Sequence, residues 1–187
     1  MSAGTTPNRD RVPIELARDS SHPEVTATFE KLRARSPVAG VSIANIHRTL
    51  ANSPVVFGRF IDFAHALRYE TTVDPAEREL AIICVLECHH GEYELVPHRK
   101  MALQLGLSQQ QVDNVRNPAT TAVYNERQRA ILQFAECFAA DPNDTARRDA
   151  GPIVDHLDNR QRIELGLILA LYLGLAHFTG TIAVPRD

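Results

Sequence analysis

The sequence predicts an all-α fold, and three observations lead to this prediction. Apolar residues recur at helical spacing along most of the chain, and no segment shows the strict alternation of a half-buried strand. Helix-start signals stand before several of the apolar runs. The chain has no tryptophan and only 6% aromatic residues, so its core must be aliphatic and rich in alanine, which favours helices.

Helical segments are expected along the chain wherever apolar residues recur every three or four positions. Ile43, Ile46 and Leu50, for example, share one face of such a segment. Pro37 and the polar stretch 141–144 interrupt the pattern. The expected segments in chain order are 13–19 (a single turn), 21–36, 43–50, 53–67, 74–90, 92–105, 108–116, 131–138, 145–156 and 160–178.

Capping signals indicate where several of these helices begin. A side chain that accepts hydrogen bonds from the first turn is followed either by proline at the first helical position or by glutamine three residues later. Gly106 provides the corresponding stop signal, since glycine suits the left-handed residue after a helix. The pairs that carry the start signal are Ser53 with Pro54, Asp74 with Pro75, Ser108 with Gln111, and Asp158 with Gln161.

Residues 74–106 carry charged side chains where an apolar helix face is expected. Leu80–Leu86 are apolar on all sides, which indicates a buried helix, and Glu79 comes directly before them. In the following helix Glu94 and His98 are four residues apart, so their side chains can touch. They also share a face with Met101, Ala102 and Leu105. The sequence therefore predicts three ionisable groups in an apolar layer.

Two interpretations of Glu79, Glu94 and His98 follow from the residues alone. Burying such groups costs several kcal/mol unless they pair, so they form either a structural network or an acid/base site. An imidazole ordinarily titrates near pH 6.5, and burial raises the pKa of a glutamate toward neutrality. On the second interpretation the three residues are catalytic, and Tyr93 and His47 are candidates for binding the substrate.

A metal site is a further possibility, but no standard zinc pattern such as HExxH is present. We therefore expect neither a metal nor another cofactor. Cys84 and Cys88 are four residues apart within or next to the apolar run, where we expect them to be inert packing groups. The possible metal donors, which lie within one short stretch, are Glu87, Cys88, His89, His90, Glu94 and His98.

Length and composition indicate one globular domain over residues 13–187, preceded by a loosely ordered tail at residues 1–12. The chain has 187 residues, 44% hydrophobic and 23% charged, with a net charge of −3. This charge and the absence of a basic run argue against binding to nucleic acid or to a membrane surface. Three unpaired cysteines, no signal peptide and no expected membrane span suit the cytoplasm.

The order of the motifs in residues 78–108 resembles that of the carboxymuconolactone decarboxylase family, which also contains the alkylhydroperoxidase D-like proteins. The resemblance implies an all-α bundle that assembles into homotrimers or homohexamers, with sites near the subunit contacts. The motifs are Arg78-Glu79-Leu80, an apolar run, Gly91-Glu92-Tyr93-Glu94, His98, Ala102 and Gly106-Leu107-Ser108.

Two features set this chain apart from what the resemblance implies. The peroxidase branch of the family carries a CxxC pair at positions that Gly91 and Glu94 occupy here, so peroxidase activity is not expected. The family commonly has Tyr-Glu-Trp where this chain has Tyr93-Glu94-Leu95, and Pro97 precedes His98 and should bend or loosen the helix.

The function expected from the residues and the resemblance is a cofactor-free lyase of the carboxymuconolactone decarboxylase type. It would act on a small carboxylated or lactone molecule by general acid/base catalysis, with His98 as the proton donor or electrostatic stabiliser. Glu94 would orient His98, and Glu79 would be the second acid/base group. The alternatives are a non-enzymatic helical homo-oligomer with a structural Glu/His network, or a peroxidase-like relative.

Overall fold

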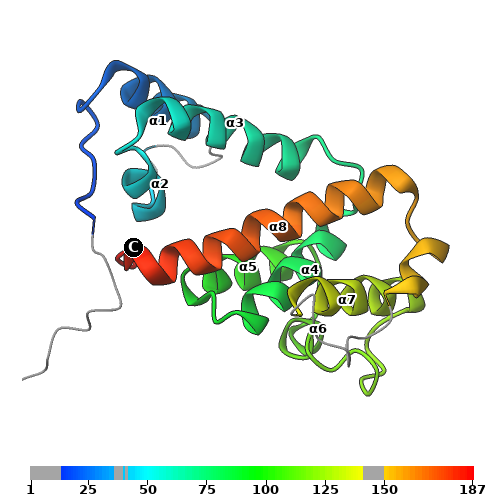
Figure 1. The fold of residues 1–187 in the computed structure, drawn as a ribbon. Coiled ribbons are helices and arrows are strands. Elements are labelled where there is room, and N and C mark those ends of the chain that lie inside the picture. Colours follow the sequence, from blue (N-terminus) through cyan, green and yellow to red (C-terminus); the bar gives the residue numbers. More distant parts are fainter. Residues whose placement is uncertain (1–13, 36–39, 41, 141–149) are drawn as a thin grey trace, which may run out of the picture. The chain divides into compact units, whose positions relative to one another are not determined.

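The computed structural model describes residues 14–35, 40, 42–140 and 150–187. Every regular element in these residues is a helix, which confirms the expected all-α class (Figure 1). The elements are α1 (Pro23–Arg35), α2 (Asn45–Leu50), α3 (Pro54–Tyr69), α4 (Pro75–Cys88), α5 (Glu92–Gln104), α6 (Gln109–Asp113), α7 (Glu126–Ala139), the 3₁₀ helix η1 (Gly151–Asp155) and α8 (Asn159–Ile182).

The chain divides into two compact units. One comprises the chain up to Phe63 together with Phe178–Asp187, and the other comprises Ala64–His177. Helices α3 and α8 each run from one unit into the other. The single domain expected over residues 13–187 thus contains two units, and the expected tail at residues 1–12 lies outside the described residues.

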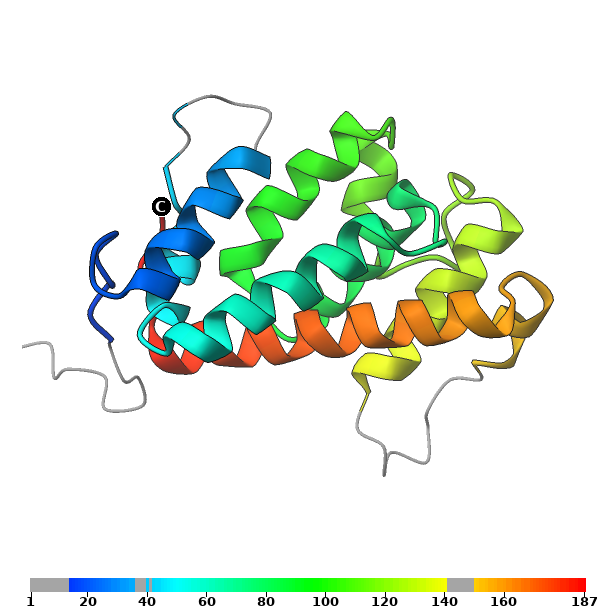
Figure 2. The ribbon, with the colours of Figure 1, turned by 90° about the horizontal axis from the view of Figure 1, so that it is seen from above.

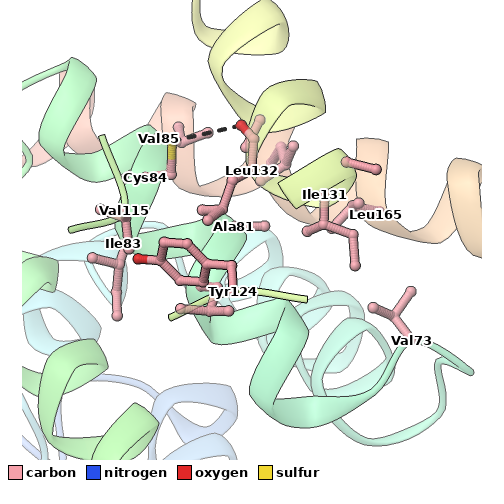
Figure 3. Packing of buried hydrophobic residues seen from close by; sticks show 14 of the residues in the cluster. Val73, Ala81, Ile83, Cys84, Val85, Val115, Tyr124, Ile131, Leu132 and Leu165 are labelled. Atoms are coloured by element: carbon pink, nitrogen blue, oxygen red, sulfur yellow. Dashed lines mark hydrogen bonds between the residues drawn. The ribbon is translucent and has the colours of Figure 1, made fainter. Parts of the chain in front are cut away.

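Helix α4 is the centre of the second unit. It lies beside α5 and α7, as the two ribbon views show (Figures 1 and 2), and it also contacts α6. All residues from Glu77 to Leu86 are buried. Figure 3 shows Ala81 and Val85 of α4 packed with Leu132 of α7. Each large aliphatic side chain that is fully buried in this way contributes about 1.5–3 kcal/mol to folding.

A smaller cluster of apolar side chains forms the core of the first unit. Phe29 and Phe57 meet edge to face with ring centroids 5.5 Å apart, and the ring of His47 lies 6.4 Å from that of Phe57. The carboxylate of Asp187 accepts a hydrogen bond of 2.6 Å from the backbone of Asn45 at the start of α2. The end of the chain is therefore attached to the first turn of α2.

Three of the four start signals read from the sequence, and the stop signal at Gly106, are confirmed. One carboxylate oxygen of Asp74 accepts hydrogen bonds from the backbone of Ala76 (2.9 Å) and Glu77 (3.1 Å). Ser108 and Asp158 form the expected capping boxes with their glutamine partners. Gly106 adopts a φ of +93°, as a left-handed helix stop requires. Because these contacts satisfy otherwise unpaired amides, the helices begin where the sequence indicates.

Several expected segments differ from the structure, and the helix expected at 131–138 begins already at Glu126. Residues 14–18 form no helix, because their backbone pairs with α2: the Ala17 N–H donates to the Arg48 carbonyl, and Arg48 Nη1 donates to the Ala17 carbonyl. The α-helix expected at 145–156 is a short 3₁₀ helix, Gly151–Asp155, and residues 145–149 lie outside the described part. The last helix continues past residue 178 to Ile182.

Helix α8 also corrects the expectation that no stretch could span a membrane. It is the one helix in the described part of the chain whose length and apolar composition would allow a crossing. Such a helix is weak evidence for a membrane, since core helices have the same properties. Leu165 and Leu169 of α8 are fully buried against the core around α4, although only 28% of the apolar window of this helix is buried.

Gly91 lies where the end of α4 comes close to α8. Its φ of −74° is open to any residue, so the backbone itself does not require glycine. A Cβ atom at this position would stand 2.6 Å from Leu86 Cδ2 and 3.0 Å from Ala176 Cβ. The close approach of the two helices therefore leaves no room for a side chain at residue 91.

Candidate functional site

Glu79 and His98 form a buried pair between α4 and α5. His98 Nδ1 lies 2.6 Å from Glu79 Oε2, and the two side chains are 3% and 1% exposed. A carboxylate accepts this hydrogen bond, so the Nδ1 proton of His98 donates and the lone pair of the neutral ring is left on Nε2. The structure thus brings together two of the three residues that the sequence selects, at hydrogen-bond distance.

Glu94 is the third member of the predicted set and lies on the other side of the His98 ring. Its Oε2 atom is 3.9 Å from His98 Nε2, which is too long for a hydrogen bond. The ring of His98 therefore lies between two carboxylates, hydrogen-bonded to Glu79 and 3.9 Å from Glu94.

Two arginines that the sequence analysis did not select complete the surroundings of Glu79. Arg78 Nη2 lies 3.6 Å from Glu79 Oε1, and Arg78 Nη1 donates a hydrogen bond of 2.6 Å to the carbonyl of Arg68. The guanidinium of Arg68 itself contacts Met101 Sδ and lies over the Tyr69 ring. Among the described residues, no carboxylate lies within 4.0 Å of Arg68. Arg68 is thus a cation without a charged partner in this part of the chain.

An open hollow of about 710 Å³ borders these groups. This volume lies within the range of about 300–1,000 Å³ that small-molecule sites occupy. Arg68, Arg78 and Glu79 line it. Met101 of α5 and Leu105, the C-cap residue of α5, line it as well. Leu105, expected on the buried face, is 44% exposed because it forms part of this wall.

A second, smaller cavity of about 10 Å³, the inner cavity, borders the same side chains. Arg68, Arg78 and Glu79 line both spaces, so they separate the open hollow from the inner cavity. The inner cavity has room for about one water molecule. Neither His98 nor Glu94 lines either space, and Glu79 is the member of the predicted set that borders both, with its side chain 1% exposed.

Tyr172 of α8 forms the far side of the inner cavity. Its ring meets the His98 ring edge-on at 4.5 Å between centroids. Burial raises the pKa of Tyr172 above its usual value, the charges of Glu79 and Glu94 raise it further, and Arg68 and Arg78 oppose this. The phenol is therefore neutral and able to donate a hydrogen bond at neutral pH.

Neither of the two residues expected to bind substrate lines the two cavities. Tyr93 is half-buried in the first turn of α5. His47 belongs to the other compact unit, where it packs against Phe57. A role of either residue in substrate binding stays a prediction.

The donors considered for a metal do not converge in the described part of the chain, where no group of three or more His, Cys, Asp or Glu side chains could hold an ion. Instead they have separate partners. Glu87 pairs with Arg99, and His89 Nε2 lies 2.8 Å from the carbonyl of Ala139. Cys88 contacts Arg116.

Residues 54–136 match the model of the carboxymuconolactone decarboxylase family. The matched segment extends from the start of α3 into α7 and contains Arg68, Arg78, Glu79, Glu94 and His98. The family resemblance seen in the sequence is thus supported for this segment, which carries all of the candidate site except Tyr172.

The fold is also that of a solved structure, an uncharacterized peroxidase-related protein from Silicibacter sp. TM1040. The two chains superpose with a TM-score of 0.76 over 98% of this chain and 96% of that one, at 18% sequence identity. At this identity the likeness shows the fold and leaves the activity open. No curated protein matches the chain.

Sequence reasoning missed Arg68, Arg78 and Tyr172 for different reasons. Arg78 had a signal, because a charged residue next to a buried apolar run needs a partner. Arg68 lies near the end of an amphipathic helix, where an arginine usually marks the solvated side. Tyr172 is more than 70 positions from His98 along the chain, and only the packing of α8 brings the two rings together.

Proposed function

We propose that this protein is a cofactor-free lyase of the carboxymuconolactone decarboxylase type, which acts on a small carboxylated or lactone molecule bound in the hollow. One observation carries the proposal. Glu79, buried and hydrogen-bonded to His98, forms the wall of a cavity of suitable size beside Arg68, a cation without a charged partner among the described residues. Family likeness over residues 54–136 supports the reaction class.

The reaction requires a place for negative charge and a source of one proton. When the carboxylate leaves as carbon dioxide, its bonding electrons remain on the substrate, where an unsaturated lactone can hold them as an enolate. A proton then takes the place of the lost group, and solvent must return one proton to the protein in each turnover. A site that stabilises the enolate more than the bound substrate accelerates the step.

In this proposal Glu79 is the catalytic residue that transfers the proton, since it faces the cavity. His98 takes a positioning role rather than the direct role expected from the sequence, because it holds the Glu79 carboxylate from behind. Arg68 stabilises the developing enolate, and Arg78 orients the second oxygen of Glu79. A well-placed acid or base contributes about 10²–10⁴-fold to the rate.

The test is release of carbon dioxide from carboxylated unsaturated lactones and from β-keto acids, measured with a chelator present. We expect turnover by the wild type and a loss of at least about 10²-fold in Glu79→Gln. Arg68→Gln should lower kcat more than it raises KM, because its main contact forms in the transition state. Arg160→Gln is the matched control, since this exposed arginine of α8 pairs with Glu164 at the surface and lines neither cavity. No release with any substrate of these two classes would refute the lyase proposal.

A structural role for the Glu/His network is the second candidate, and the burial of His98 favours it: the residue is 2% exposed and lines neither cavity. Removing one partner of a buried pair that serves only stability costs about 3–5 kcal/mol. In that case Glu79→Gln and His98→Gln would melt at much lower temperature without affecting any turnover. Under the lyase proposal both variants lose rate while retaining a folded state at 25 °C.

A further inference from the structure

The hollow beside Glu79 is lined by charged side chains of both signs. Among its described lining residues, the cations are Arg68, Arg78 and Arg127, and the carboxylates are those of Asp74 and Glu79. A cation that already contacts a carboxylate attracts a second anion only weakly, because the two opposite charges largely cancel at a distance. The charge that a bound molecule must carry therefore depends on which of these groups already have a partner.

Arg127 of α7 has a partner that does not belong to the lining of the hollow. Its Nε atom donates to both carboxylate oxygens of Glu77 in α4, at 2.9 Å each. Its Nη1 atom also donates to the carbonyl of His156. The Glu77 side chain is 11% exposed and does not line the hollow, whereas Arg127 does. Glu77 thus neutralises a cation of the hollow without contacting a molecule bound there.

Of the other cations in the lining, Arg68 is the one without an opposite charge beside it in the described part of the chain. Arg78 Nη2 lies 3.6 Å from Glu79 Oε1. Arg68 contacts Met101 Sδ, which carries no charge. The Asp74 carboxylate accepts hydrogen bonds from the first-turn amides of α4 and adds a negative charge to the wall. The hollow therefore has one positive charge left for a bound anion.

We propose that Glu77 determines the substrate class of this hollow: by neutralising Arg127 it restricts the site to small organic anions of single negative charge, and dianions are rejected. The inference deepens the proposed function, on which it rests for the choice of the hollow as the substrate site. In that reaction the charge of the departing carboxylate passes to the enolate, so Arg68 balances the same single charge before and after the step. Met101 and Leu105 offer apolar contacts to the rest of the molecule.

The test compares three probes built on one ring. Furan-2-carboxylate carries one charge, furan-2,5-dicarboxylate carries two, and 5-carbamoylfuran-2-carboxylate has a neutral amide of the same size in place of the second carboxylate. Ligand-observed NMR titration of the wild type at low ionic strength gives the affinities, since salt screens these charges. We expect the dicarboxylate to bind at least about tenfold more weakly than the other two. Equal or tighter binding of the dicarboxylate overturns the proposal, as does a failure of all three probes to bind.

Glu77→Gln tests whether Glu77 is the cause of this selectivity. The variant keeps a side chain of the same size but leaves Arg127 without its carboxylate, so the hollow gains a second available cation. The affinity for the dicarboxylate relative to furan-2-carboxylate should rise at least about tenfold. Adding Arg127→Gln to this variant removes the second cation, and the ratio should return to that of the wild type. An unchanged ratio in folded Glu77→Gln overturns the role of Glu77.

Glu87→Gln is the matched control. It removes the same charge from another carboxylate of α4 that pairs with an arginine, Arg99, and neither of these residues lines the two cavities. Its affinity ratio should equal that of the wild type. A rise as large as in Glu77→Gln would overturn the proposal, because the net charge of the protein would then explain both. Circular dichroism establishes that each variant is folded, and the wild-type comparison decides the matter if Glu77→Gln does not fold.

Failure of this inference is distinguishable from failure of the lyase proposal. The probes bind without reacting, so the preference for a single charge is measured whether or not carbon dioxide is released from any substrate. Selective binding without release refutes the lyase proposal and leaves the charge class in place. Release of carbon dioxide together with tight binding of the dicarboxylate probe has the opposite meaning.

Discussion

At the scale of single residues, the candidate site depends on how Glu79 tolerates burial. A carboxylate that loses its water costs several kcal/mol unless other groups replace that water. His98 does so at one oxygen and Arg78 lies near the other. The buried carboxylate of Glu79 is therefore stable only while His98 and Arg78 are both in place.

His47, in the unit that contains α1 and α2, allows the effect of burial on a histidine to be tested. Burial lowers the pKa of His47 below its ordinary value of 6.5, and the charge of Asp187 raises it in part. The folded state therefore binds the proton more weakly than the unfolded state does. The stability that neutral His47 contributes is present above about pH 6.5 and is lost as the pH falls through that value toward the folded pKa.

We accordingly expect the melting temperature to fall between pH 7.5 and pH 5.5, and to fall less in His47→Gln than in the wild type. Melting curves followed by circular dichroism measure this difference. His22→Gln is the control, since His22 is exposed before the start of α1. An identical pH dependence in the wild type and His47→Gln would show that His47 titrates alike in both states.

At the scale of elements, the join between α4 and α5 places Glu79 opposite His98. The Gly91 N–H donates a hydrogen bond of 2.8 Å to the carbonyl of Leu86, which closes the end of α4. The chain then turns back within a few residues, and α5 continues through Pro97 in spite of the missing backbone donor. The close contact of Gly91 with α8 fixes this turn against the core.

Gly91→Ala should lower the free energy of unfolding by about 1–3 kcal/mol, because its Cβ would overlap Leu86 and crowd Ala176. Gly174→Ala is the matched control. It lies in α8 with nothing within 4 Å of the added Cβ, so it should stabilise by about 0.5–1 kcal/mol through helix propensity. Urea unfolding of both variants measures the contrast, and equal effects would mean that the turn relaxes freely.

The elements were largely predictable from the sequence, and the site only in part. Caps act within one turn, so Asp74 and Ser108 could be recognised without tertiary contacts. Glu79 and His98 could be paired because apolar neighbours on each helix reveal the buried face. Arg68 could not be placed, since its position on the cavity wall depends on how α3 meets α4 and α5. The sequence predicts too early an end for α8, because the apolar pattern becomes weak after residue 178. The helix ends at Ile182, and Ala183 directly after it has a φ of +55°.

At the scale of the whole molecule, α8 leaves apolar side chains uncovered in the single chain. Ile163 is 67% exposed and Leu167 is 45% exposed, and the two share one face at a spacing of four residues. The apolar run of α4, in contrast, is covered within the chain. Self-association through α8 would remove such side chains from water.

We therefore expect a homotrimer or homohexamer, as the family resemblance implies, with α8 in the interface. Light scattering on dilute protein measures the mass. Ile163→Glu should dissociate the assembly, whereas Val154→Glu, which places the same charge on the exposed 3₁₀ helix, should not. A monomeric wild type at micromolar concentration contradicts this prediction.

The tight packing at Gly91 also bears on how such a chain changes over generations. In the peroxidase branch of the family that this sequence resembles, the first cysteine of the pair stands at the position of Gly91. Here the Cβ atom of a cysteine would overlap Leu86 and crowd Ala176. Introducing that thiol pair would therefore require Leu86 to move, or Leu86 or Ala176 to become smaller. The contact between α4 and α8 would be disturbed before any chemistry was gained.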